Sequence, residues 1–183
     1  MEMRCALAAL PYCFTVPKVS KWAIFVPFSS NWLAGDLNVT VASDDFYILG
    51  ILTSSTHRIW MYAQSSTFKA DIAYTPTTCF ETFPFPQNCP AKTKIAIRAA
   101  MQTLHDFRTE YMERKQCGIT QIYNQFFGEP ASQLAKLHTK LDKLVATAYD
   151  LKPSDDPLKF LLDLNTKIAT RETQGLPVVG LGS

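Results

Sequence analysis

The chain has 183 residues and a mass of 20.6 kDa, which allows one substantial domain or a compact domain with a helical appendage. Hydrophobic residues make up 47% and charged residues 19%, and no apolar run approaches the roughly 18 residues of a membrane span, so a disordered tail and a membrane protein are both excluded. The net charge of +2 excludes nucleic-acid binding through a global positive field. Only locally placed cations could serve that purpose.

The cysteines indicate a reducing environment. Their number, five, is odd, and no pair has the C-x-x-C spacing, so the sequence encodes neither a disulfide framework nor a zinc knuckle. We therefore expect a cytoplasmic protein without a metal site. The residues are Cys5, Cys13, Cys79, Cys89 and Cys117.

The first part of the chain predicts short strands followed by a buried helix. Runs of aromatic and β-branched residues bounded by Pro, Ser, Asn or Gly are typical of strands. The strands are expected over residues 12–16, 23–28 and 37–42. Ser43 is a favourable N-cap, so a helix is expected to begin there. Because residues 46–52 are apolar on nearly all sides, this helix is expected to be buried, to break around residues 53–56 and to resume over residues 57–62.

The next segment predicts a loop and a strand. Residues 63–78 lose all periodicity and are rich in Ser, Thr, Lys and Asp, which favours a loop. Residues 79–83 predict a strand that ends at Pro84. The large aromatic side chains of this region are expected to fill the core rather than to stack on bases. They are Trp60, Tyr74, Phe80, Phe83 and Phe85.

Helical periodicity dominates after about residue 90. Apolar residues recur at helical spacing, and Gly118 is expected to stop the first and longest helix. The helices are expected over residues 91–116, 119–127, 130–149 and 157–171. The sequence therefore predicts an α+β fold, with a small β-containing domain over residues 1–90, a helical region over residues 91–172 and a flexible tail over residues 173–183.

Several segments resemble, in the same order, the C-terminal part of the large single-chain adenine-specific DNA methyltransferases of the MmeI type. The longest is SSTFKADIAYTPTTCFETFPFP at residues 65–86, which resembles the block that closes the family's target-recognition domain. The other segments are residues 16–21, 46–52, 57–60, 118–124, 137–149 and 161–165. The resemblance is distributed over roughly residues 12–170.

This resemblance implies sequence-specific recognition of double-stranded DNA, together with a catalytic methyltransferase domain or partner chain. The family's catalytic core binds S-adenosylmethionine with a Gly-rich loop and holds a flipped adenine with an Asn/Asp-Pro-Pro-aromatic motif. This chain has only 7 glycines and no Pro-Pro pair. We therefore expect no cofactor and no methyl transfer by this polypeptide alone.

Lys69 and Asp71 are the candidates for contacts with bases, because the resemblance places them where the family's recognition domain meets the major groove. In an extended segment, residues two apart point the same way. Lysine can donate to guanine O6 or N7, and aspartate can accept from cytosine N4. Ala73 departs from the basic residue that is often found at this place in the family. An ordinary solvated surface pair remains the alternative for Lys69 and Asp71.

Lys18, Ser20 and Lys21 are candidates for phosphate contacts, which position a protein on DNA without reading its sequence. Arg58 is a further candidate. Solvent exposure alone also accounts for these residues. His57 lacks partners at a spacing that suits a nucleophile or a metal ligand.

Two other functions are compatible with the sequence. One is a protein-interaction module that keeps the fold but has lost DNA contact, for instance the remnant of a broken gene. The other is a stand-alone hydrolase with an unrecognised site. A catalytic methyltransferase core encoded immediately upstream would favour a split enzyme over a remnant, and an assay for turnover would test the hydrolase.

Overall fold

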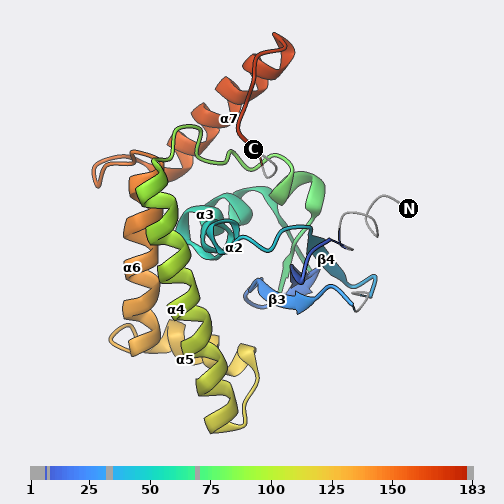
Figure 1. Ribbon diagram of the computed structural model, residues 1–183, viewed down its shortest axis with the longest axis vertical. Coiled ribbons are helices and arrows are strands. Elements are labelled where there is room, and N and C mark those ends of the chain that lie inside the picture. The colour runs from blue at the N-terminus through green and yellow to red at the C-terminus, as the bar shows by residue number, and fades with distance from the viewer. Residues whose placement is uncertain (1–6, 8, 32–34, 69–70, 181–183) are drawn as a thin grey trace.

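The computed structural model describes residue 7 and residues 9–31, 35–68 and 71–180. Its fold is α+β, as the sequence predicts: small antiparallel sheets with two helices are followed by a helical region (Figure 1). The elements of the first part are β1 (Tyr12–Pro17), β2 (Val19–Ser20), β3 (Val26–Ser29), β4 (Asn38–Val41), α2 (Phe46–Thr53), α3 (Ser55–Gln64), β5 (Ser66–Phe68), β6 (Asp71–Ala73) and the π-helical turn η1 (Pro76–Phe80). The helical region comprises α4 (Ala91–Lys115), α5 (Ile119–Gly128), α6 (Gln133–Ala148) and α7 (Pro157–Thr173).

The first sheet has the order β3-β1-β4, with both pairings antiparallel. The central strand β1 buries four residues in succession, from Cys13 to Val16. A strand covered on both faces buries successive residues rather than alternate ones. The three strands predicted from the sequence are confirmed, although β3 begins at Val26 rather than at Ala23. Ala23 has a φ of 45°, a left-handed conformation that does not continue a strand.

The second sheet has the order β2-β6-β5 and lies where a loop is predicted over residues 63–78. That prediction is wrong for most of the segment, because α3 extends to Gln64 and an antiparallel hairpin follows. Among the hairpin residues whose burial is described, only Ile72, in the central strand, is buried. Its second pairing partner, Val19–Ser20, lies about 50 residues earlier in the chain. Local composition therefore gives no sign of it.

The strand predicted over residues 79–83 is also wrong. Residues Pro76–Phe80 form a π-helical turn, in which Glu81 N donates to Pro76 O at 2.9 Å. Prolines, at positions 76, 84 and 86, remove the amide donors that a sheet would need here. The expected burial of the aromatic side chains is confirmed, since Trp60, Tyr74, Phe83 and Phe85 are buried and Phe80 is half-buried.

Helices α2 and α3 follow the predicted break but not the predicted first cap. Asp45, rather than Ser43, caps α2 by accepting from Tyr47 N at 2.8 Å. Ser54 then ends α2 and caps α3. Helix α2 is buried from Tyr47 to Thr53, as its apolar composition predicts. Asp45 also forms a bidentate ion pair with Arg98 of α4, with both N–O distances at 2.6 Å.

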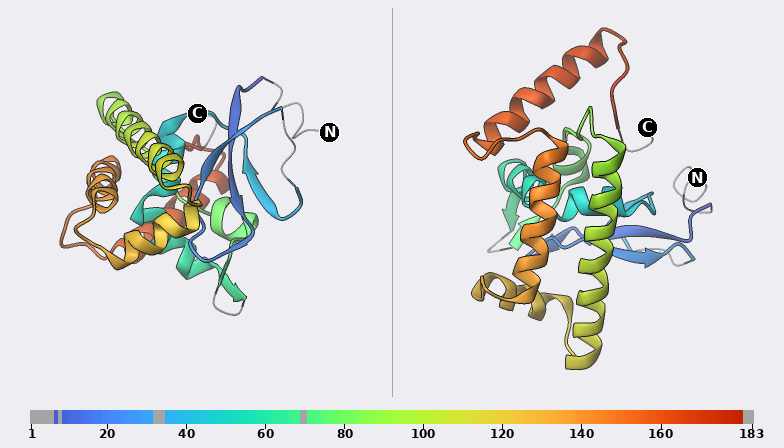
Figure 2. Two further views of the ribbon diagram at one scale, coloured as in Figure 1. Left: turned by 90° about the horizontal axis from the view of Figure 1, so that it is seen from below. Right: turned by 60° about the vertical axis from the view of Figure 1, so that its left-hand side comes forward.

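The four predicted helices after residue 90 are confirmed, with small shifts at their ends. Helices α4 and α6 lie side by side and run in opposite directions, and α5 connects their far ends (Figures 1 and 2). Helix α4 ends earlier than expected, because Gln116 adopts a left-handed conformation with a φ of 47°. None of the described helices is both long and apolar enough to cross a membrane.

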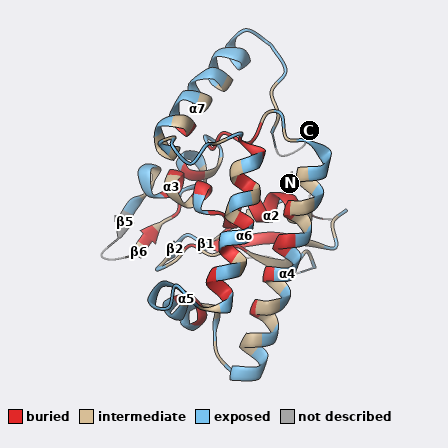
Figure 3. Ribbon diagram, turned by 90° about the vertical axis from the view of Figure 1, so that its left-hand side faces the viewer, coloured by how far each residue is buried: buried red, intermediate tan, exposed pale blue. Residues whose placement is uncertain are grey.

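One hydrophobic core joins the two parts of the chain. It includes Phe14 of β1, Leu49 of α2, Met101 of α4 and Leu141 of α6, all of them fully buried. Figure 3 shows the buried faces of α4 and α6 turned toward α2, while α7 is mostly exposed. The domain boundary expected near residue 90 remains a prediction. The hydrophobic core contains residues from both sides of this boundary.

The end of the described chain returns to the segment between η1 and α4. Gln87 Nε2 donates to Val179 O at 3.0 Å, and Val179 N donates to Gln87 Oε1 at 2.9 Å. Arg171 also donates to Pro177 O at 3.0 Å. The flexible tail expected from residue 173 remains a prediction.

Candidate nucleic-acid interface

The second sheet brings together residues that are distant in sequence. Ser20 of β2 pairs with Ile72 of β6, the residue after Asp71. Lys18 precedes β2, and its backbone is held on both sides: its amide donates to Leu37 O at 2.8 Å, and its carbonyl accepts from Tyr74 N at 2.7 Å. Ser20 and Asp71 therefore belong to one small sheet, and Lys18 directly precedes its strand β2.

The hairpin presents polar groups on its outer face. Side chains alternate along β6, so that Ile72 is buried while Asp71 and Ala73 on the other face are half-exposed. Among the described residues, no side chain forms a hydrogen bond or an ion pair with the Asp71 carboxylate. Lys69, its proposed companion, lies outside the described residues.

Ser20 has a structural role that the sequence did not reveal. Its hydroxyl oxygen accepts from Ala23 N at 3.0 Å and closes the turn that follows β2. Because a hydroxyl can accept and donate at the same time, its proton remains available to a phosphate oxygen. The expected phosphate contact is thus compatible with the turn.

Lys21 and Arg58 both contact helix α5. Lys21 Nζ donates to Asn124 Oδ1 at 2.8 Å and lies 4.7 Å from the centre of the Trp22 ring. The Arg58 guanidinium of α3 lies 4.9 Å from the centre of the Phe127 ring. Lys21 and Arg58 therefore form a cluster with α5. Asp71 is not part of this cluster, because it lies in the hairpin of β5 and β6.

The cluster has two residues that sequence reasoning missed, Trp22 and Asn124. Trp22 Nε1 also donates to Asn124 Oδ1, at 3.1 Å. The only signal that pointed to Asn124 was the resemblance of residues 118–124 to a family segment, which named no role. Trp22 stands next to Lys21 in a short polar stretch and gave no periodic signal.

The candidate cations have no carboxylate partner within the described part of the chain. The one ion pair found there joins Arg98 to Asp45. Arg58 still affects its surroundings: burial raises the pKa of Asp142, while the hydrogen bond from Ser55 and the charge of Arg58 oppose that rise. Lys18, Lys21 and Arg58 can therefore accept an external anion without first breaking an ion pair.

His57 is a core residue, not a cation. Its Nε2 lies 3.1 Å from the Tyr74 hydroxyl, and the ring is fully buried. Burial, and secondarily the charge of Arg58, lower the pKa of His57 to about 3. The histidine is neutral at physiological pH and contributes no phosphate contact through charge. No group of described residues could hold a metal ion.

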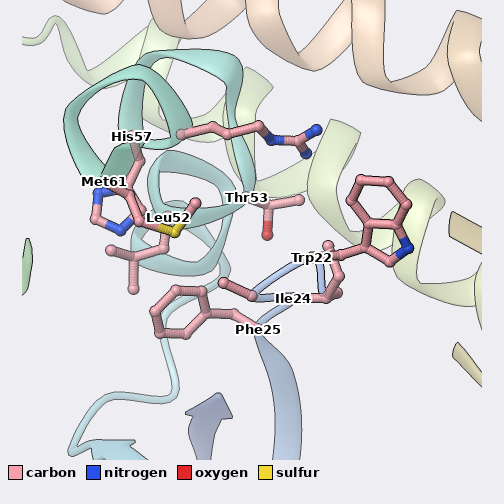
Figure 4. Close-up of a pocket in the computed structure, with 9 residues that line it drawn as sticks. Trp22, Ile24, Phe25, Leu52, Thr53, His57 and Met61 are labelled. Carbon is pink, nitrogen blue, oxygen red and sulfur yellow. The ribbon is translucent and has the colours of Figure 1, made fainter. Parts of the chain in front are cut away.

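A small cavity lies between the turn after β2 and helices α2 and α3 (Figure 4). Its volume is about 10 Å³, which is room for about one water molecule. Thr53 Oγ1 and His57 Nδ1, both from its lining, have no hydrogen-bond partner among the described residues. A base or a cofactor does not fit in this cavity.

The fold consists of two small antiparallel sheets with helices, followed by a helical region. Residues 11–87 match the family model of the MmeI target recognition domain. The resemblance found in the sequence is thereby confirmed.

Two known proteins are similar over most of the chain. DNA methyltransferase A of Bacillus subtilis (strain 168) is 29% identical over 168 residues, which cover 87% of this chain and 18% of that protein. The solved structure of the Type IIL restriction-modification enzyme MmeI in complex with DNA has a TM-score of 0.67 at 20% identity, covering 87% of this chain and 21% of that one. The chain thus spans about a fifth of the length of these relatives.

Proposed function

We propose that this chain recognises a specific sequence in double-stranded DNA for an adenine-specific methyltransferase of a restriction-modification system. The observation that carries the proposal is the match of residues 11–87 to the MmeI target recognition domain. Methyl transfer would be carried out by a separate catalytic domain or chain, because the motifs for S-adenosylmethionine and for a flipped adenine are missing from this sequence. Such a protein works in the cytoplasm, where it meets DNA.

In this proposal, Lys69 and Asp71 contact base edges. The half-exposed Asp71 carboxylate, unpaired among the described residues, supports this role. A good bidentate contact favours the correct base over a wrong one by about 1–3 kcal/mol. Exchanging the charges of Lys69 and Asp71 should therefore change the base that is preferred at one position.

Lys18, Ser20, Lys21 and Arg58 contact phosphates in this proposal. Their support is the lack of carboxylate partners for the three cations among the described residues, and the free proton of the Ser20 hydroxyl. Phosphate contacts add affinity to all sequences alike and make binding weaken as salt rises. We expect weak binding by the isolated chain, because these contacts are few.

The test is selection of duplexes from a pool with a randomised segment. The unmodified chain should enrich one short motif at low salt. The double exchange Lys69→Asp with Asp71→Lys should change one base of that motif, whereas Lys18→Ala should enrich the same motif with lower affinity. Arg114→Ala, at an exposed position on the distant end of α4, serves as the matched charge control.

Two outcomes would contradict the proposal. If the unmodified chain enriches no motif even when joined to its catalytic partner, the chain does not read DNA, and the protein-interaction alternative gains. If the double exchange leaves the motif unchanged, Lys69 and Asp71 are ordinary surface residues. Saturable binding of S-adenosylmethionine to this chain in calorimetry would contradict the proposal that cofactor binding and methyl transfer belong to a separate catalytic domain or chain.

A further inference from the structure

A tight turn joins the second sheet to helix α5. Ser20 ends β2, and its hydroxyl accepts from Ala23 N at 3.0 Å while Ala23 adopts a φ of 45°. Lys21 and Trp22 therefore lie at the apex of a closed turn. Any group that holds the apex also holds the end of β2.

Asn124 of α5 holds this apex with a single atom. Its Oδ1 accepts from Lys21 Nζ at 2.8 Å and from Trp22 Nε1 at 3.1 Å. Both of these groups can only donate, so the atom that receives them must be an oxygen. The side chains that meet here are about 100 residues apart in sequence.

Aromatic packing reinforces the same contact. The Trp22 ring stacks on the Phe127 ring of α5, with centroids 4.1 Å apart and planes 22° from parallel. Arg58 covers Phe127 from α3 at 4.9 Å. The Phe127 side chain is nevertheless 41% exposed, so hydrophobic burial alone does not explain its position.

Helix α5 is itself anchored in the helical region. Tyr123, next to Asn124, is fully buried, and its hydroxyl accepts from Arg108 of α4 at 3.1 Å. The same hydroxyl lies 2.9 Å from Nε2 of His138 on α6. Asn124 therefore projects from a helix that is tied to both long helices.

At its β2 end, the turn is connected to the hairpin of β5 and β6, which is proposed to contact DNA bases. Ser20 pairs with Ile72 and Val19 with Ala73, in the strand that begins at Asp71. We infer that Asn124 is a positioning residue through which helix α5 sets the position of the hairpin that reads DNA. This inference rests on the proposed function, and it gives the helical region a part in sequence discrimination.

Asn124 also orients a cation without neutralising it. The Lys21 ammonium has three protons, of which Asn124 accepts one. The others remain able to reach a phosphate. An aspartate at position 124 would keep the acceptor but add a negative charge beside Lys21, so Asn124→Asp separates positioning from charge.

Hydrogen exchange measured on the full chain without DNA tests the positioning. Asn124→Ala removes two hydrogen bonds of typical strength and should speed exchange in residues 18–24 and 71–74 by roughly tenfold. Exchange in α4 and α6 should not change. Asn124→Asp should keep the protection of the unmodified chain, and so should Thr120→Ala, at an exposed position of the same helix.

Discrimination between DNA duplexes tests the consequence. Fluorescence anisotropy with the enriched duplex and with a scrambled one should give Asn124→Ala a ratio of affinities lowered roughly tenfold, because base contacts need accurate geometry. Asn124→Asp should bind both duplexes more weakly and keep the ratio. Thr120→Ala should match the unmodified chain in both respects.

Each outcome decides the inference. Unchanged exchange in Asn124→Ala, or faster exchange throughout α4 and α6, would overturn the positioning role. If hydrogen exchange in the hairpin becomes faster but the ratio of affinities for the two duplexes does not change, the position of the hairpin does not control sequence discrimination, and that part of the inference is overturned. If the unmodified chain distinguishes no duplexes, the proposed function fails, and the exchange measurement alone decides whether Asn124 holds the hairpin.

Discussion

Two buried histidines share one arrangement, in which the ring meets a tyrosine hydroxyl. His57 Nε2 lies 3.1 Å from Tyr74, and His138 Nε2 lies 2.9 Å from Tyr123. Burial is the main reason that the pKa of each histidine falls to about 3, with nearby arginine charges adding to the effect. Both rings are therefore neutral in the folded protein over the physiological pH range.

Because of these two histidines, the free energy of unfolding depends on pH. The ordinary pKa of 6.5 applies in the unfolded chain, which therefore takes up protons before the folded protein does. The stabilisation is complete above about pH 6.5 and is lost as the pH falls toward about 3. Each histidine contributes up to about 1.4 kcal/mol per pH unit in this window.

We expect His57→Phe to reduce the loss of unfolding free energy between pH 6.5 and about 4.5. Phenylalanine keeps the packing against Phe83, whose ring centre lies 4.5 Å away, but has no proton to take up. Urea unfolding at several pH values gives the slope. His138→Phe should lower it similarly, since both pKa values are shifted to the same extent. A slope equal to that of the unmodified chain would contradict the histidine origin.

At the scale of elements, α2 and α4 approach closely at Gly50. A Cβ at this position would lie 2.7 Å from Cγ2 of Ile97 and 3.4 Å from both Leu141 Cδ1 and Met101 Cβ. Ile97 is fully buried and branched at Cβ, so its methyl group has little room to move. The glycine therefore sets the distance between a helix of the recognition part and the helical region.

Gly50→Ala should lower the free energy of unfolding by about 1–3 kcal/mol, because overpacking outweighs the gain in helix propensity. Gly128→Ala is the matched control, since this glycine also lies in a helix and a Cβ there would meet nothing within 4 Å. Thermal melts of both variants give the comparison. A Gly50→Ala variant as stable as the control would show that the two helices can move apart.

The elements that sequence predicted well are those encoded locally. Helices α4 to α7 follow apolar residues at helical spacing, and Ser54 marks the break between α2 and α3. The hairpin of β5 and β6 was missed because its partner β2 is remote and because Ile72 is the only buried residue among those of the hairpin whose burial is described. The turn at Pro76–Phe80 was missed because alternation of Phe with polar residues imitates a strand.

The candidate site was predicted in part. Lys18, Ser20, Lys21, Arg58, Lys69 and Asp71 came from the resemblance and from the chemistry of their side chains, and their roles remain predictions. Trp22 and Asn124 could not be found, because a contact across about 100 residues leaves no local pattern. Only the folded chain brings the turn after β2 onto α5.

At the scale of the whole molecule, the shared core makes the recognition part depend on the helices. Phe14 and Leu49 belong to the same cluster as Met101, Leu141 and Val145. Removing the helices would expose these apolar surfaces together, and each buried side chain contributes about 1.5–3 kcal/mol. The two parts should therefore unfold as one cooperative unit.

The chain carries two separate reporters for this prediction. All three tryptophans, Trp22, Trp32 and Trp60, lie in the first 90 residues, whereas helices α4 to α7 lie beyond residue 90. Tryptophan fluorescence therefore follows mainly the recognition part, although Trp22 also reports its stacking on Phe127 of α5. Far-ultraviolet circular dichroism mainly follows the helical region. In urea, the two signals should change at one midpoint with one slope. Midpoints that differ would mean that packing across residue 90 is too weak to couple the two parts, and that the recognition part folds without its helices.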